Sequence, residues 1–167
     1  EVKAYVDAQM ALMATPRVQM IGHSHNKTDL TDLSLYIIRC GFEDNRVRRF
    51  TLPAYEALID LPLAEIADGR SDLGEAVQEP LYLVCTNGRR DVCCSRYGLE
   101  IYKALHARDS HVWQSNHIGG HRFAGTLVTF PYGIYYGRVT PADVDALFDA
   151  TAAGKVLLSR MRGRASS

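Results

Sequence analysis

The first half of the chain alternates between helical and strand patterns of hydrophobic side chains. Residues 3–14 place apolar side chains at helical spacing, and Pro16 ends this predicted helix. Short apolar runs predict three strands, at residues 18–21, 33–38 and 46–52. Residues 54–67 return to helical spacing, with an interruption at Pro62. We therefore expect an N-terminal α/β extension over residues 1–79, packed on the same domain as the rest of the chain.

The second half has sharper patterns, in the order strand, helix, strand, strand, strand, helix. These elements are expected at residues 81–85, 97–107, 111–115, 126–130, 134–139 and 141–153. Thr140 and Pro141 are residue types that begin a helix, and Gly154 is the type that follows a helix end. The order predicts an α/β core domain over residues 80–157, followed by a C-terminal tail at 158–167.

The charges of the chain cancel, because 19 basic side chains face 19 acidic ones among 167 residues. No global field attracts nucleic acid or an anionic membrane, so partner choice must depend on local patches. No apolar run approaches the roughly 20 residues that cross a bilayer. We therefore expect a soluble cytoplasmic protein with no nucleic-acid or membrane partner.

Cysteine usage points to intracellular chemistry rather than to a disulfide scaffold. The chain has only four cysteines, and three of them lie between Cys85 and Cys94. This crowding indicates metal or redox chemistry in a reducing compartment. The chain begins with Glu1 rather than Met and ends in a basic run of small residues at 162–167, so we expect a piece of a longer protein.

Two short segments concentrate the residues that bind soft metals: CTNGRRDVCC, from Cys85 to Cys94, and HIGGH, from His117 to His121. Cys85 ends a predicted strand, and Cys94 precedes a predicted helix, whose backbone dipoles favour a thiolate. The two glycines between the histidines argue against a helix and favour a tight loop. Two thiolates and two imidazoles suit tetrahedral iron or zinc, and composition alone does not choose between the two metals.

Several motifs resemble the sucrase/ferredoxin-like family, whose members are similar to thioredoxin-like ferredoxins. They are LYLVCTNGRRDVCC, VWQSNHIGGHRFAG and YYGRV, which occur in this order between about residues 80 and 155. The resemblance implies a thioredoxin-like domain with a mixed sheet flanked by helices. It also implies a 2Fe-2S cluster bound by a cysteine pair nine positions apart and a histidine pair four positions apart. By motif, these ligands fall on Cys85, Cys94, His117 and His121.

The chain departs from the family pattern at two positions near these ligands. Asn87 stands where many members have histidine, and Gly125 where proline or alanine is common. Neither position is a ligand, so the departures concern packing or tuning. The family name includes sucrase, but no pair of carboxylates in a glycosidase setting is evident. We expect an electron carrier with redox protein partners rather than a catalyst.

Three rival functions would use some or all of the same cysteines and histidines. A zinc site would use the same four ligands. A thiol-disulfide oxidoreductase normally has Cys-x-x-Cys at a helix start, whereas this chain has the vicinal pair Cys93 and Cys94. A cysteine-based phosphatase needs arginine six positions after its nucleophile, and Asp91 stands six after Cys85. The phosphatase is discarded, and zinc remains the strongest rival.

Other candidate residues receive structural interpretations. Cys93 and Cys40 are expected to be small buried hydrophobic residues. His23 and His25 are expected to be loop histidines without a metal, and His106 and His111 to lie at the end of a helix, where a positive charge is favourable. Arg89, Arg90 and Arg122 border the predicted ligands. These arginines are either solvated loop charges, one paired with Asp91, or a docking site for an acidic redox partner.

Overall fold

The computed structural model describes residues 1–23, 32–89 and 92–165, and the chain forms two compact units. Unit 1 comprises Glu1–Val18 and Asn26–Gln78, and unit 2 comprises Gln19–His25 and Glu79–Ser167.

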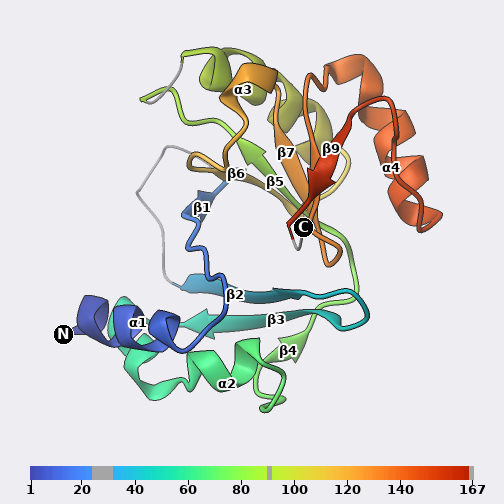
Figure 1. The fold of residues 1–167 in the computed structure, drawn as a ribbon. Coiled ribbons are helices and arrows are strands. Elements are labelled where there is room, and N and C mark those ends of the chain that lie inside the picture. The colour runs from blue at the N-terminus through green and yellow to red at the C-terminus, as the bar shows by residue number, and fades with distance from the viewer. Residues whose placement is uncertain (24–31, 90–91, 166–167) are drawn as a thin grey trace. The chain divides into compact units, whose positions relative to one another are not determined.

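Unit 1 contains a three-stranded antiparallel sheet in the order β2-β3-β4 (Figure 1). Strands β2 (Leu33–Cys40) and β3 (Asn45–Leu52) pair along their whole length, and β4 (Glu75–Ala76) adds two residues to the edge of β3. The predicted strands at 33–38 and 46–52 are therefore present, each extended by one or two residues.

Three helices accompany this sheet: α1 (Val2–Ala11), the 3-10 helix η1 (Tyr55–Asp60) and α2 (Leu63–Ala67). Pro62 separates η1 from α2, as its effect on helix geometry predicts. The Tyr5 hydroxyl donates to the Leu61 carbonyl at 2.6 Å, and the Ala64 amide donates to the Gln9 side chain at 3.0 Å. One face of α1 is thus fixed to the loop around Pro62.

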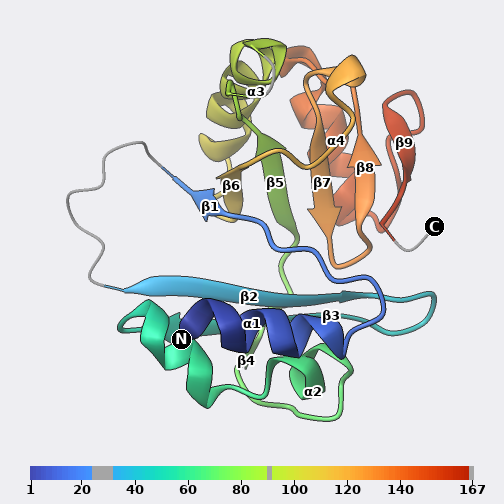
Figure 2. The same cartoon turned by 60° about the vertical axis from the view of Figure 1, so that its left-hand side comes forward.

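Unit 2 contains a six-stranded mixed sheet in the order β1-β6-β5-β7-β8-β9 (Figures 1 and 2). Its strands are β1 (Ile21–Gly22), β5 (Leu81–Cys85), β6 (Val112–Ser115), β7 (Leu127–Phe130), β8 (Ile134–Tyr136) and β9 (Met161–Arg164). Strands β5 and β6 are parallel and are joined by α3 (Val92–His106), whereas β7 is antiparallel to β5 and forms a hairpin with β8. A short 3-10 helix, η3 (Pro141–Asp143), leads into α4 (Val144–Ala152). This arrangement confirms the expected α/β class, with a mixed sheet accompanied by helices.

The core of unit 2 joins the central strands to both long helices. Tyr82 and Val84 of β5 pack in one cluster with Ile101 and Leu105 of α3 and Leu147 of α4. Alternate residues of β5 face this cluster, yet all five residues of the strand are buried. A short, wholly apolar strand is typical of the centre of a parallel or mixed sheet, which explains why LYLVC was clear in the sequence.

The structure differs from the sequence-based expectation at three places in unit 2. Met161–Arg164 forms β9 and pairs with β8, although residues 158–167 were expected to be a tail. Ile21 and Gly22 form the outer strand β1 beside β6 rather than part of an N-terminal extension. Helix α3 begins at Val92, five residues before the expected start. The edge strands have weak apolar patterns, and the apolar helical spacing in the sequence is clear only from residue 97 onward.

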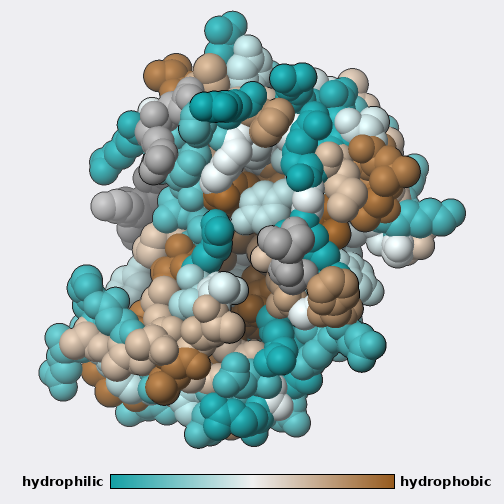
Figure 3. All heavy atoms as spheres, viewed as in Figure 1, coloured by the Kyte–Doolittle hydropathy of each residue, from teal (hydrophilic) through white to brown (hydrophobic). Residues whose placement is uncertain are grey.

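The visible surface in Figure 3 mixes hydrophilic residues with scattered apolar ones. Large exposed hydrophobic side chains include Phe42 and Leu158. Single exposed apolar side chains are ordinary on soluble surfaces. Among the described residues, none of the helices has the length and apolar character to cross a membrane.

Asp143 stabilises the start of α4, and this leads to a prediction about pH. Its carboxylate accepts hydrogen bonds from the Thr140 backbone amide at 2.8 Å and from Arg160 Nε at 3.0 Å. Burial alone would raise the pKa of Asp143, but the bonds from Thr140 and Arg160 outweigh it and lower the pKa. Asp143→Asn should therefore reduce the free energy of unfolding of unit 2 by about 1–2 kcal/mol near neutral pH.

The pH dependence follows from the direction of this shift. A carboxyl group with a lowered folded-state pKa stabilises above its unfolded pKa of about 3.9, and that contribution disappears as the pH falls through the folded value. Urea unfolding followed by the fluorescence of the single tryptophan, Trp113, should show the Asp143→Asn deficit at pH 7 and a smaller one near pH 3. Asp149→Asn, at an exposed site on α4, is the matched control. A deficit that is equal at both pH values would contradict the role of the ionised carboxylate.

Candidate metal centre

Cys85 lies at the carboxyl end of the buried strand β5. Its backbone amide donates to the Thr126 carbonyl at 3.0 Å, and its side chain is 0% exposed. The hydrogen bonds to the neighbouring strands on both sides of β5 fix the backbone here, so the thiol has a defined position at the carboxyl end of this central strand.

Cys94 is the third residue of α3 and is 1% exposed. The backbone amides in the first turn of a helix have no intrahelical acceptor and favour negative charge nearby. A thiolate at Cys94 would therefore be in a suitable electrostatic setting.

Gly98 explains how α3 comes so close to the end of β5. A Cβ atom placed on Gly98 would lie 2.0 Å from the Cys85 carbonyl oxygen, far inside contact distance. Only glycine at this position lets the helix backbone approach the strand, and this approach brings the first turn of α3 next to Cys85. Gly98 was not predicted from the sequence to shape the site; the available signal was a glycine within an amphipathic helix, where it costs about 1 kcal/mol relative to alanine.

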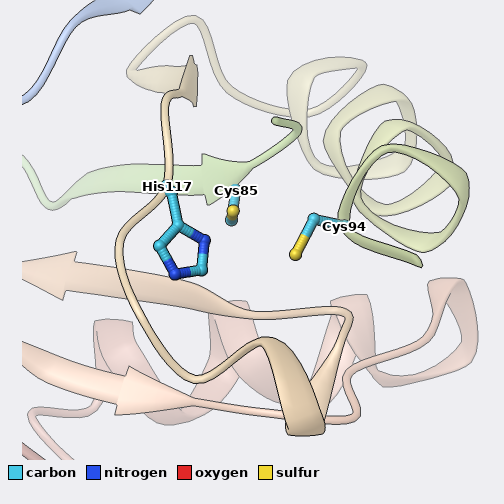
Figure 4. A group of neighbouring side chains, drawn as sticks. All are labelled: Cys85, Cys94 and His117. Carbon is cyan, nitrogen blue, oxygen red and sulfur yellow. The ribbon is translucent and has the colours of Figure 1, made fainter. Parts of the chain in front are cut away.

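His117 completes a group of three potential ligands. It follows β6, the parallel neighbour of β5, so its loop starts from the same edge of the sheet as Cys85. The ligand atoms of Cys85, Cys94 and His117 all lie within 4.8 Å of one another (Figure 4). Two sulfur donors and one nitrogen donor from three separate elements therefore converge on one place.

His121 lies near this group but outside it. Gly119 and Gly120 have positive φ angles of 98° and 69°, so the segment turns sharply, as the sequence predicted, instead of forming a helix. His121 then begins the 3-10 helix η2 (His121–Phe123), and its ring centroid is 6.0 Å from that of His117. The role of His121 as a fourth ligand stays a prediction.

Cys93 differs from its expectation, because its side chain is exposed rather than buried. Successive residues of a helix point about 100° apart, so Cys93 is directed away when Cys94 faces β5. Cys40 is half-buried at the end of β2, in unit 1.

The remaining histidines in the described part of the chain do not join the cysteines. The His23 ring stacks on Trp113 with centroids 3.7 Å apart and lies 5.0 Å from the His106 ring. Burial, and then the proximity of His106, lower the pKa of His23. His111 Nδ1 lies 2.9 Å from an Asp109 carboxylate oxygen, just beyond the end of α3. His25 is outside the described residues.

The two departures from the family pattern have local structural settings. The Asn87 side chain accepts a hydrogen bond from the Arg89 amide at 3.0 Å and so shapes the loop after Cys85. Gly125 has a φ of 51°, and a Cβ there would lie 2.4 Å from the Val139 carbonyl oxygen. A larger residue at Gly125 would require a different course of the chain. The expected ion pair with Asp91 involves a residue outside the described ones.

The chain is similar to several known proteins. The model of the family described as "Sucrase/ferredoxin-like" matches residues 5–163. "Altered inheritance of mitochondria protein 32" from Meyerozyma guilliermondii is 34% identical over 99 residues, which cover 52% of this chain and 35% of that protein. The protein of the same name from Eremothecium gossypii is 37% identical over 89 residues, or 50% and 26% of the two chains. The matched part thus spans between about a quarter and about a third of the length of these two curated relatives.

Among solved structures, the wild-type thioredoxin-like [2Fe-2S] ferredoxin from Aquifex aeolicus matches with 18% identity and a TM-score of 0.47. The match covers 53% of this chain and 100% of that one.

Proposed function

The chain belongs to the sucrase/ferredoxin-like family, and from this we propose that it holds one 2Fe-2S cluster and transfers single electrons. The proposed ligands are Cys85, Cys94, His117 and His121. The observation that carries the proposal is the convergence of two buried thiols and one imidazole within 4.8 Å. Cysteine thiolates, in some proteins together with imidazoles, are the ligands of such clusters, and a bound cluster would supply a one-electron redox centre.

The surroundings of the donors fit a cluster site. Cys85 and Cys94 are almost fully buried, and the His117 ring lies beside them. The His121 ring centroid lies 6.0 Å from that of His117, so both imidazoles would be available to hold the cluster together with the two thiolates. The segment from Cys85 to Cys94 would thus supply the thiolates, and the segment from His117 to His121 the imidazoles.

Zinc is the competing interpretation, because three donors of this kind also suit a tetrahedral zinc site. After anaerobic isolation we expect about two irons and two acid-labile sulfides per chain, with the visible absorption of a red-brown protein. Stoichiometric zinc without sulfide in a colourless protein would contradict the proposal. Cys40→Ser, in unit 1, is the control that should leave the metal content unchanged.

A second prediction concerns the reduction potential. Two neutral imidazoles in place of two thiolates remove two negative charges, so the potential should lie above the approximately −400 mV of plant-type ferredoxins. A metal-bound imidazole loses its remaining proton more readily while iron is oxidised, so at alkaline pH the potential should fall by about 59 mV per pH unit for each proton taken up per electron. Protein voltammetry across the pH range tests this dependence. A flat potential, or one unchanged in His117→Cys, would remove the histidines from the ligand set.

The wider role of the protein follows as part of the same proposal. An electron carrier needs a protein donor and acceptor, and no catalytic residue is assigned. The sequence favours a cytoplasmic location, whereas the names of the curated relatives refer to mitochondria. Fractionation of cells that express the full-length protein would distinguish these compartments.

A further inference from the structure

Phe123, next to the proposed ligand loop, is an exposed aromatic ring packed against two arginines. The guanidinium carbon of Arg162 lies 4.9 Å from the ring centroid, and that of Arg138 lies 5.6 Å from it. Gly137 allows this packing, because a Cβ there would lie 2.7 Å from the Phe123 Cβ and 3.2 Å from Arg162. Three segments of unit 2 therefore build one feature, which we call the arginine surface: Arg122, Phe123, Arg138 and Arg162.

The charges of the arginine surface are not neutralised. All three of its arginines are exposed, and no carboxylate in the described part of the chain forms an ion pair with them. Elsewhere in unit 2, Arg108 pairs with Asp145 and Arg160 with Asp143. The three exposed arginines therefore carry positive charge that no carboxylate in the described part of the chain neutralises.

The charge of the units supports the same distinction. Unit 2 has eleven basic and seven acidic side chains, a net charge of +4, whereas unit 1 has eight basic and twelve acidic ones, a net charge of −4. The neutrality of the whole chain therefore conceals a basic unit that contains the proposed redox site.

Arg138 also has an unfavourable backbone conformation. Its φ of 55° makes it the only non-glycine residue with a positive φ among those described. Its backbone amide donates to the Phe123 carbonyl at 2.9 Å, which holds this conformation and places its side chain over the ring. Glycine would adopt this φ without a penalty. Strain at an exposed arginine without an ion pair favours a functional reason for its side chain.

We propose that the arginine surface binds an acidic face of the protein that exchanges electrons with this chain. This inference rests on the proposed function and names its docking site. Phe123 lies two residues after His121 in the same 3-10 helix, about 4 Å along its axis, so a partner docked here would be close to the proposed ligand. Arginine and aromatic residues are enriched at protein interfaces, and complementary charge raises the rate of association. One electron passes between the centres, and no bond is made or broken.

The test uses the reduced holoprotein and two small oxidants of opposite charge. Stopped-flow spectroscopy compares the rate of cluster oxidation by hexacyanoferrate(III), an anion, with that by tris(phenanthroline)cobalt(III), a cation. In Arg122→Gln/Arg138→Gln/Arg162→Gln, the rate with the anion should fall about tenfold or more at low salt, and the rate with the cation should not fall. High salt should reduce this difference between the variant and the wild type.

Arg108→Gln is the matched control. Arg108 also lies over a phenylalanine, with its guanidinium carbon 5.3 Å from the Phe148 ring centroid, but it is paired with Asp145. It follows the far end of α3, about 20 Å along the helix from Cys94, beyond a Debye length at moderate salt. Its rates with both oxidants should match those of the wild type.

Arg138→Gly separates binding from folding. The urea midpoint of this variant should rise, because glycine accepts the positive φ, while oxidation by hexacyanoferrate(III) slows. Polyglutamate should protect the wild-type cluster from the anion, and this protection should be lost in the triple variant.

The outcomes keep the two proposals apart. Wild-type protein without cluster absorbance would overturn the proposed function. A loaded protein whose rates with both oxidants are unaffected by the triple substitution would overturn the docking site alone. Protection by phosphatidylserine vesicles but not by polyglutamate would also overturn it, in favour of a membrane surface.

Discussion

Cys94→Ser should lower bound iron more than about tenfold, whereas Cys93→Ser, one residue earlier in the same helical turn, should keep it. Cys94 is buried and belongs to the group formed with Cys85 and His117, while Cys93 is exposed and lies outside that group. Removal of a thiolate leaves the metal with an incomplete set of ligands. A serine hydroxyl is a poor replacement for a thiolate as a ligand of soft metals.

The comparison is well matched because both variants make the same chemical change in the first turn of α3. Iron, sulfide and visible absorption should be measured on both proteins after identical anaerobic preparation. Circular dichroism would show whether α3 is intact in each. Loss of the cluster in Cys93→Ser with retention in Cys94→Ser would transfer the ligand role to Cys93.

Gly98→Ala is expected to have the second large effect, on both stability and metal content. Helix propensity alone would favour alanine by about 1 kcal/mol. The new Cβ, however, would lie 2.0 Å from the Cys85 carbonyl oxygen, a backbone atom of a central strand that has little freedom to move. Helix α3 must therefore shift, and we expect a loss of about 2–4 kcal/mol in the free energy of unfolding.

The shift would also separate Cys94 from Cys85, so the cluster content should fall in parallel. Gly154→Ala is the control: no atom lies within 4 Å of its Cβ position, and its φ of 64° alone should cost about 1 kcal/mol. Urea unfolding and iron analysis of the two variants give the comparison. A Gly98→Ala protein that is more stable than the wild type and fully loaded would show that the helix does not need this close approach.

The central elements of unit 2 could be predicted from the sequence because their apolar residues occupy the buried positions of the strands and helices. Strand β5 is a continuous apolar run with turn residues after it, and the Thr140-Pro141 pair marks the start of the last helix in a standard way. Strand β9 was not predicted, because the segment MRGR shows little hydrophobic pattern. It contributes mainly backbone pairing at the edge of the sheet.

The candidate site was predictable at the level of segments and less so at the level of atoms. Cys85 and His117 follow neighbouring parallel strands, so their convergence follows from topology. The place of His121 depends on the two positive φ angles before it, which the sequence permits but does not specify. The contribution of Gly98 requires knowledge of how closely a helix approaches a strand, which apolar periodicity does not reveal.

Strand β1 shows that the two units are interleaved along the polypeptide. Residues 19–25 belong to unit 2 but lie between two segments of unit 1, and Asn26–Gln78 of unit 1 lies between β1 and β5 of unit 2. Neither unit can therefore be removed by a single cut, and a fragment that starts at Glu79 would leave the outer backbone of β6 bare. During synthesis, Ile21 must wait until Ser115 has been made before the two can pair. In evolution, loss of either unit would require two separate deletions, so we expect the units to be inherited together.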